Sequence, residues 1–258
     1  VEGLPGVIRR GGSAPDPEPW QGTVKRRIRR QDDPYAYYLQ RGGMLNIQTK
    51  RGCPFGCLYC TYPHIEGRRL RLSPPEEVAR EARELQELGA RYLFITDSVF
   101  NADCAHSREV AKAFRRAGVA IPWGAFFAPT RPPAGYYREL TEAGLRHVEF
   151  GTESFSDSQL KVYGKPFRSA ELLAAHESAR EAGAHIAHYL LLGGPGENGQ
   201  TLRETLDRME GIEKAVFFLF CGIRIYPHTG LYDLALREGQ IAPDQDLRVE
   251  SGPEPGVQ

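Results

Sequence analysis

Residues 44–60 read MLNIQTKRGCPFGCLYC, and the rest of the chain is best interpreted outward from this stretch. It opens with a strand-like segment, Met44–Thr49, and runs into a loop that holds three of the five cysteines of the chain. Gly52 and Gly56 lie among these cysteines and let the loop turn tightly. The stretch therefore predicts a β-strand that delivers a cysteine-rich loop.

Downstream of this loop, apolar segments typical of strands alternate with segments of helical periodicity. The expected strands are Met44–Thr49, Tyr92–Thr96, Ile121–Phe127, His147–Gly151, His185–Leu192 and Val216–Tyr226. The expected helices are a first one that Ser73 caps and Gly89 ends, then His106–Ala117, Tyr136–Ala143, Ala170–Ala182, Thr201–Glu213 and Leu231–Arg237. Strands that are almost continuously apolar and alternate with helices predict a parallel sheet with right-handed crossovers.

The number of units limits the architecture of this α/β chain. Six β-α units are too few for a closed eight-stranded barrel, so they suit either an open doubly wound sheet or a partial barrel. In both architectures the reactive residues lie on loops at the carboxyl ends of the strands.

The cysteines have metal-ligand spacing. Cys53, Cys57 and Cys60 form a C-x3-C-x2-C pattern directly after the first strand, and three thiolates can bind three irons of a cubane cluster, leaving one iron open. The alternative is a structural zinc site in which His64 completes a Cys3His tetrahedron, in a non-catalytic module. The position in a β-α array favours the cluster. Clustered cysteines suit a reducing compartment, so we expect a cytoplasmic protein.

Further motifs lie at or just past the expected strand ends. They are residues 60–68 (CTYPHIEGR), 96–101 (TDSVFN), 150–154 (FGTES), 193–197 (GGPGE) and 224–227 (RIYP). Together with the cysteine motif they resemble the radical S-adenosylmethionine (SAM) superfamily, in particular its cobalamin-associated branch and, more loosely, members linked to lipid biosynthesis. The resemblance implies a partial (β/α)6 TIM-like barrel with the cluster loop after its first strand.

The resemblance also implies an enzyme that cleaves SAM reductively at a [4Fe–4S] cluster, giving a 5′-deoxyadenosyl radical that acts on an unreactive C–H bond. Cys53, Cys57 and Cys60 would ligate the cluster. The implied SAM contacts form three sets: Asp97 and Ser98 at the ammonium group, Glu153 and Ser154 at the ribose hydroxyls or the methionine carboxylate, and Tyr59, Gly194 and Pro195 at the adenine. Lys165 and Arg224 either pair with a carboxylate of SAM or substrate, or lie in solvent.

The use of cobalamin is left open by the sequence. Members of the cobalamin-associated branch carry an N-terminal domain with a D-x-H-x-x-G motif that supplies a cobalt ligand, and these 258 residues have no such motif. We divide the chain into a linker or N-terminal extension (residues 1–43), the catalytic domain (44–240) and a C-terminal tail (241–258). The turn-rich ends suggest a piece of a longer polypeptide.

The expected partners follow from charge and from the resemblance. Lys and Arg total 33, and so do Asp and Glu, so the formal net charge of zero gives no reason to expect nucleic acid as a partner. No apolar run is long enough to span a bilayer. The resemblance implies a small-molecule or lipid-like substrate, methylated or rearranged, and a one-electron donor such as flavodoxin or ferredoxin. Cys104 and Cys221 are expected to be buried apolar residues and not ligands.

Overall fold

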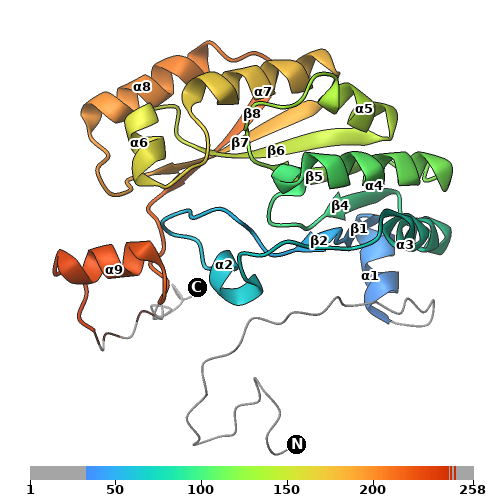
Figure 1. Cartoon of the computed structure of the whole chain (residues 1–258), viewed down its shortest axis with the longest axis horizontal. Coiled ribbons are helices and arrows are strands. Elements are labelled where there is room, and N and C mark those ends of the chain that lie inside the picture. Colours follow the sequence, from blue (N-terminus) through green and yellow to red (C-terminus); the bar gives the residue numbers. More distant parts are fainter. Residues whose placement is uncertain (1–32, 244, 246, 248–258) are drawn as a thin grey trace, which may run out of the picture.

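The computed structural model describes residues 33–243, 245 and 247, and a single parallel sheet organises them (Figure 1). Its strands are β1 (Met44–Ile47), β4 (Tyr92–Ile95), β5 (Trp123–Phe127), β6 (Leu145–Glu153), β7 (His185–Leu192) and β8 (Ala215–Cys221). The strands lie side by side in their sequence order, and every neighbouring pair is parallel. A small antiparallel hairpin, β2 (Lys50–Arg51) with β3 (Arg71–Leu72), flanks the cysteine loop.

The helices that connect the strands cover one side of the sheet. They are α3 (Pro75–Leu88), α4 (Cys104–Arg116), α5 (Tyr136–Glu142), α6 (Asp157–Val162), α7 (Ser169–Glu181) and α8 (Gly199–Glu210). Right-handed crossovers between strands in sequential order place every connecting helix on the same side. Figure 1 shows α5, α7 and α8 on that side, whereas the cysteine loop, α2 (Tyr62–Glu66) and α9 (Gly230–Arg237) lie on the other.

The main core fills the space between the sheet and these helices. Trp123 on β5 is fully buried, and its ring meets Phe100 at 5.4 Å and Phe114 at 5.8 Å in edge-to-face contacts. The indole N–H of Trp123 donates to the carbonyl of Ala143, so this large side chain leaves no polar atom unsatisfied. Burial on the helix side fixes the register of each strand, because a shift by one residue would turn its apolar side chains to the opposite face.

The partial barrel predicted from the sequence is confirmed, and the doubly wound alternative is excluded by the sequential strand order. The structure adds helix α1 (Asp33–Arg41) within the segment interpreted as a linker, and Tyr35 and Leu39 of α1 pack against the core. It also adds the short helices α2 and α6. Ser73 does not cap α3, because Pro74 occupies the cap position.

Several expectations remain untested by the described residues. Most of the proposed N-terminal extension and most of the proposed tail lie outside them, and the division of the chain at residues 44 and 240 stays a prediction. None of the helices in the described part of the chain has the length and apolarity required to cross a membrane.

The helix side of the sheet contains a buried histidine pair that makes stability depend on pH. His188 lies between Thr152 Oγ1 at 2.7 Å and His176 Nδ1 at 3.0 Å, and burial, with His176 beside it, lowers the pKa of His188 to about 3. As the pH falls, the His188 imidazole therefore takes up its proton at a higher pH in the unfolded chain than in the folded chain. Stability is therefore expected to fall as pH drops from about 6.5 toward 3, by up to about 1.4 kcal/mol per pH unit from this group.

Chemical denaturation at a series of pH values checks this expectation. His188→Leu should lower stability at pH 7, because it leaves Thr152 and His176 without a hydrogen-bond partner, but it should flatten the pH dependence below 6.5. An equally steep dependence in the variant would show that His188 is not the group responsible.

Candidate functional site

The cysteine loop begins where β1 ends and is fixed first by its own hairpin. The Cys53 N–H donates to the carbonyl of Gly67, and Ser98, which follows β4, donates its hydroxyl to the carbonyl of Gly52. Gly52 has φ of +87°, and a Cβ there would lie 2.2 Å from the carbonyl oxygen of Arg69. Only glycine fits this position, so the backbone enters the loop along one path.

Two distant segments hold the middle of the loop. The Leu58 N–H donates to the carbonyl of Tyr163 after α6, and the Leu58 carbonyl accepts from Leu231 in α9. Gly164, with φ of +68°, packs so closely that a Cβ would lie 2.7 Å from the Gly56 carbonyl oxygen. The loop is thus clamped between β1 and two elements that follow more than a hundred residues later.

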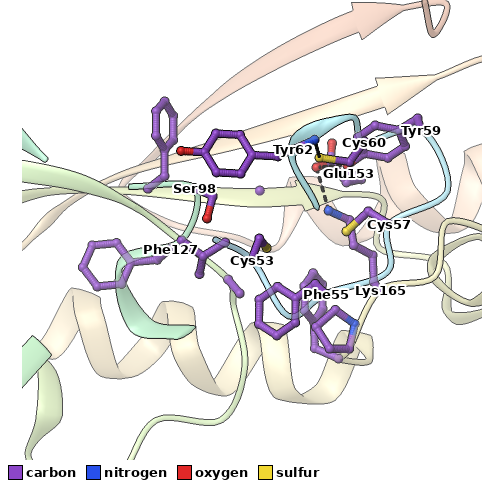
Figure 2. A pocket seen from close by; sticks show the side chains of 16 residues that line it. Cys53, Phe55, Cys57, Tyr59, Cys60, Tyr62, Ser98, Phe127, Glu153 and Lys165 are labelled. Atoms are coloured by element: carbon purple, nitrogen blue, oxygen red, sulfur yellow. Dashed lines mark hydrogen bonds and ion pairs between the residues drawn. The ribbon is translucent and has the colours of Figure 1, made fainter. Parts of the chain in front are cut away.

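The three thiols of the loop line one cavity at the carboxyl ends of the strands (Figure 2). The cavity is lined by Cys53, Phe55, Cys57, Tyr59, Cys60, Tyr62, Ser98, Val99, Phe126, Phe127, Ala128, Gly151, Glu153, Lys165, Pro166 and Phe167. Aromatic rings make up much of the wall, and the polar groups gather around the cysteines. Such a lining combines an apolar enclosure with a few placed polar groups, as small-molecule sites do.

The electrostatics of the thiols suit ligation by a metal cluster. Burial raises the pKa of Cys57 and of Cys60, while Lys165 acts in the opposite direction at Cys57. The Tyr62 N–H donates to Cys60 Sγ at 3.4 Å. Thiols of this kind stay protonated until a cation replaces the proton, which is how metal binding and thiol deprotonation are coupled.

Glu153, at the end of β6, forms the polar centre of the cavity. Its Oε1 accepts from Lys165 Nζ at 2.8 Å and from the Tyr59 hydroxyl at 2.6 Å. Burial disfavours the charged lysine and is the largest single influence, but Glu153, Cys57 and Cys60 together outweigh it, so the pKa of Lys165 is raised. Burial and Glu153 also raise the pKa of Tyr59, which keeps its hydroxyl a donor.

The backbone at Glu153 is strained. Its φ is +62°, a left-handed conformation that a residue with a side chain seldom adopts. Strain of this kind persists only where surrounding contacts enforce it, and it is concentrated at functional sites. Here it marks the point where β6 ends and its carboxylate meets the cysteine loop.

Asp97 is bound by residues at the start of the cysteine loop. Its carboxylate is 1% exposed and accepts from Lys50 Nζ at 2.8 Å and from the Thr49 N–H and hydroxyl at 2.7 and 2.5 Å. Both oxygens are occupied, and the residue does not line the cavity. In this structure the Asp97 carboxylate joins β4 to the start of the cysteine loop, and its contact with the SAM ammonium group stays a prediction.

Three further predicted contacts also lie off the cavity wall. The Ser154 hydroxyl is buried against Thr205, and the Pro195 carbonyl accepts from Gln159. Gly194 packs against Tyr163, where a Cβ would lie 2.2 Å from the phenol oxygen. These residues support the site from behind. The predicted residues that the structure does bring together are Cys53, Cys57, Cys60, Tyr59, Ser98 and Glu153.

Sequence reasoning undervalued Lys165, because nothing in its local pattern distinguishes a buried cation from a solvated one. Arg224, weighed equally, is exposed beside Tyr226. Cys221 is exposed, contrary to expectation, and Cys104 is partly buried.

The zinc alternative does not fit the geometry. His64 stacks on His228 with ring centroids 4.6 Å apart. Within the described ranges, no three His, Cys, Asp or Glu side chains are arranged around a single ion. A cubane cluster does not require its ligands to surround a single ion, because each thiolate binds a different iron.

Fold and site together define an α/β half-barrel enzyme with a three-thiol loop at the carboxyl end of its first strand. The family model described as the Radical SAM superfamily matches residues 47–209, and the chain belongs to this superfamily. The sequence-based identification, the prediction of an enzyme, and the assignment of a [4Fe–4S] cluster and SAM as the cofactors of this family are thereby confirmed.

Several relatives of this chain are methyltransferases that are much longer than it. Cytidylyl-2-hydroxyethylphosphonate methyltransferase of Streptomyces wedmorensis is 28% identical over 85% of this chain, and tryptophan 2-C-methyltransferase of Streptomyces laurentii is 28% identical over 82%. The structure of the radical SAM methyltransferase TsrM from Kitasatospora setae, with cobalamin and a [4Fe–4S] cluster bound, superposes with a TM-score of 0.75 at 25% identity over 83% of this chain. The chain spans about 40% of each of these proteins.

The buried Lys50–Asp97 pair generates a prediction that separates stability from cofactor binding. Asp97→Ala leaves a buried ammonium unpaired and should lower the free energy of unfolding by about 3–5 kcal/mol. The double variant Lys50→Met/Asp97→Leu should recover much of this loss, since it removes both charges. Denaturant titration of the three proteins checks this, and a full-stability Asp97→Ala protein with weakened SAM binding would restore Asp97 to the site.

The clamp at Gly164 generates a second prediction, with a control matched in backbone conformation. Gly164→Ala should lower both stability and the iron content after anaerobic reconstitution, because the new methyl group pushes the Gly56 carbonyl and its loop outward. Gly183→Ala imposes a similar strain at φ of +81° but meets no neighbouring atom, so it should lower stability alone. Equal iron content per folded chain in the two variants would contradict the clamp.

Proposed function

We propose that this chain is the catalytic part of a SAM-dependent methyltransferase whose cluster is ligated by Cys53, Cys57 and Cys60. The observation that carries the proposal is the placement of these three thiols around one cavity together with the Glu153–Lys165 pair. The cluster with SAM supplies one-electron chemistry that activates an otherwise unreactive carbon. The chain's own residues bind, orient and enclose the reactants.

Glu153, Lys165 and Tyr59 are proposed to recognise the polar part of SAM. A buried carboxylate beside a buried ammonium offers partners of both signs for a group that carries an amine and a carboxylate. On binding, the amine of SAM would pair with Glu153 and its carboxylate with Lys165. These contacts would replace the ion pair that the two side chains form with each other. Ser98 stays proposed at the ammonium group, and the ring of Tyr59, whose hydroxyl holds Glu153, stays proposed at the adenine, as the resemblance implies.

Methyl transfer is proposed as the overall reaction. It is supported by the names of the relatives, which include a phosphonate, a tryptophan and a hopanoid methylase. Cobalamin is proposed as the methyl carrier, because the TsrM structure holds it together with the cluster. The D-x-H-x-x-G motif is absent from these 258 residues, so the cobalt ligand that it supplies is not among them. A one-electron donor protein such as flavodoxin or ferredoxin remains a proposal of the same kind.

The cysteine assignment is tested by substitution with two cysteines as internal controls. Cys53→Ala, Cys57→Ala and Cys60→Ala should each reduce the iron and sulfide content from about four per chain to near zero after anaerobic reconstitution, and abolish the visible absorption of the cluster. Cys104→Ala and Cys221→Ala should retain both, since neither thiol lines the cavity. SAM affinity, measured by calorimetry, should fall with the cluster.

The assignment would be contradicted if the reconstituted protein were colourless and bound one zinc per chain, and if Cys53→Ala left its stability unchanged. Normal iron content in any one of the three cavity variants would remove that cysteine from the ligand set.

A further inference from the structure

The side of the sheet that carries no connecting helices presents an unusual surface. Successive side chains of a strand point to opposite faces, so on β6 Val148 and Phe150 are buried against the helices while Glu149 and Gly151 face the other way. The register places Phe126 of β5 beside Glu149 and Tyr189 of β7 beside Gly151. We call this side of the sheet the inner face.

Aromatic rings cross the inner face in a continuous row. The inner aromatic strip consists of Phe94, Phe126, Tyr189, Phe218 and Phe220. Neighbouring rings have centroids 5.0 to 6.1 Å apart, from Phe94–Phe126 at one end to Tyr189–Phe218 and Tyr189–Phe220 at the other. Phe126, Phe218 and Phe220 are 37%, 44% and 49% exposed. A contiguous row of exposed large rings is typical of a binding surface.

The carboxylate of Glu149 lies beside this row and has one oxygen without a hydrogen-bond donor among the described residues. Glu149 is half-buried, and its Oε2 accepts from the Tyr189 hydroxyl at 2.9 Å. Within the described part of the chain, Glu149 forms no ion pair and its Oε1 accepts no hydrogen bond. Burial raises the pKa of Glu149, and no basic side chain opposes the shift. A recessed carboxylate of this kind is stabilised by a donor that arrives from outside.

The strip is continuous with the cysteine cavity. Phe126 and Gly151 belong to both, because they line the cavity as well as the inner face. Gly151 has no side chain, and a Cβ there would come within 4 Å of a single atom, Glu153 Oε1 at 3.4 Å. The inner face is therefore open at Gly151, which forms a floor beside the Phe126 and Tyr189 rings, with Glu149 on one side and the thiols on the other.

We propose that this floor binds the methyl-accepting substrate, and that the substrate is a flat aromatic or heteroaromatic molecule whose N–H or O–H donates to Glu149. The inference rests on the proposed function and specifies its substrate class. A flat ring over Gly151 packs onto Phe126 and Tyr189, whose rings already contact each other with centroids 6.1 Å apart, at the spacings that aromatic pairs favour. Its reacting edge then faces the cavity.

The observations favour this occupant over a lipid chain or a protein surface. An aliphatic chain makes no use of the free Glu149 oxygen, and covering that oxygen without a donor carries a desolvation cost. A second copy of this chain would have to bury the same carboxylate. The shared residues Phe126 and Gly151 lead instead to the site of chemistry, which a substrate has to reach.

The test uses the reconstituted protein with SAM present and two probes of one shape. Indole has an N–H, whereas 1-benzofuran has an oxygen at that position. Equilibrium dialysis should show indole binding about tenfold tighter than 1-benzofuran, as expected for a hydrogen bond to a charged group. Glu149→Leu should remove this difference, and Gly151→Leu should abolish binding of both. Glu210→Leu, which changes an exposed carboxylate on α8, should leave the difference intact.

Each alternative occupant of the inner face predicts a different experimental result. Equal affinity of the wild-type protein for the two probes, or tighter binding of decanol than of indole, would overturn the inference. So would a dimer in light scattering that Phe218→Asp dissociates. Calorimetry with SAM on the same wild-type sample separates the two levels: SAM binding without probe discrimination defeats the inference alone, whereas absence of SAM binding defeats the proposed function.

Discussion

Right-handed crossovers between strands in sequential order are the constraint on which this structure depends. They place all connecting helices on one side of the sheet, and the core forms there around residues such as Trp123. The other side is left without connecting helices, and the cysteine loop after β1 crosses it at the carboxyl ends of the strands (Figure 1). The location of the cavity thus follows from the topology, before any individual side chain is considered.

Two buried ion pairs of the same chemistry have different functions in this frame. The side chains of Lys50 and Asp97 are each 1% exposed. The Asp97 carboxylate also accepts a hydrogen bond from the Thr49 N–H, so this pair fixes the start of the cysteine loop. Lys165–Glu153 is 7% and 10% exposed and lines the cavity. The first pair does not line the cavity, whereas the second pair does. Access to the cavity, not charge, distinguishes the two pairs, and it is the reason why only the second is proposed to bind SAM.

The sequence predicted the parallel strands and the cysteine loop because hydrophobic periodicity and metal-ligand spacing are local signals. Periodicity left the strand order open, and the partial barrel came from the family resemblance. The sequence could not separate Asp97 from Glu153, since both are carboxylates at strand ends and their difference lies in partners about 50 and 94 positions away. It undervalued Lys165 for the same reason. The close packing of Gly194 on Tyr163 was also beyond the sequence, because the two residues come from separate segments of the chain.

The alternation of side chains in the strands divides the protein into a constant side and an adjustable side. On β6, a change at Val148 or Phe150 disturbs the core, because both are fully buried against the helices. A change at Glu149 or Gly151 spares this core and alters the inner face and, at Gly151, the adjoining wall of the cysteine cavity. A protein built this way can keep the cluster loop and its clamps fixed while the inner positions determine which molecule reaches them. Specificity in this chain is therefore best sought at the inner positions of β5 to β8, one residue away in sequence from the core.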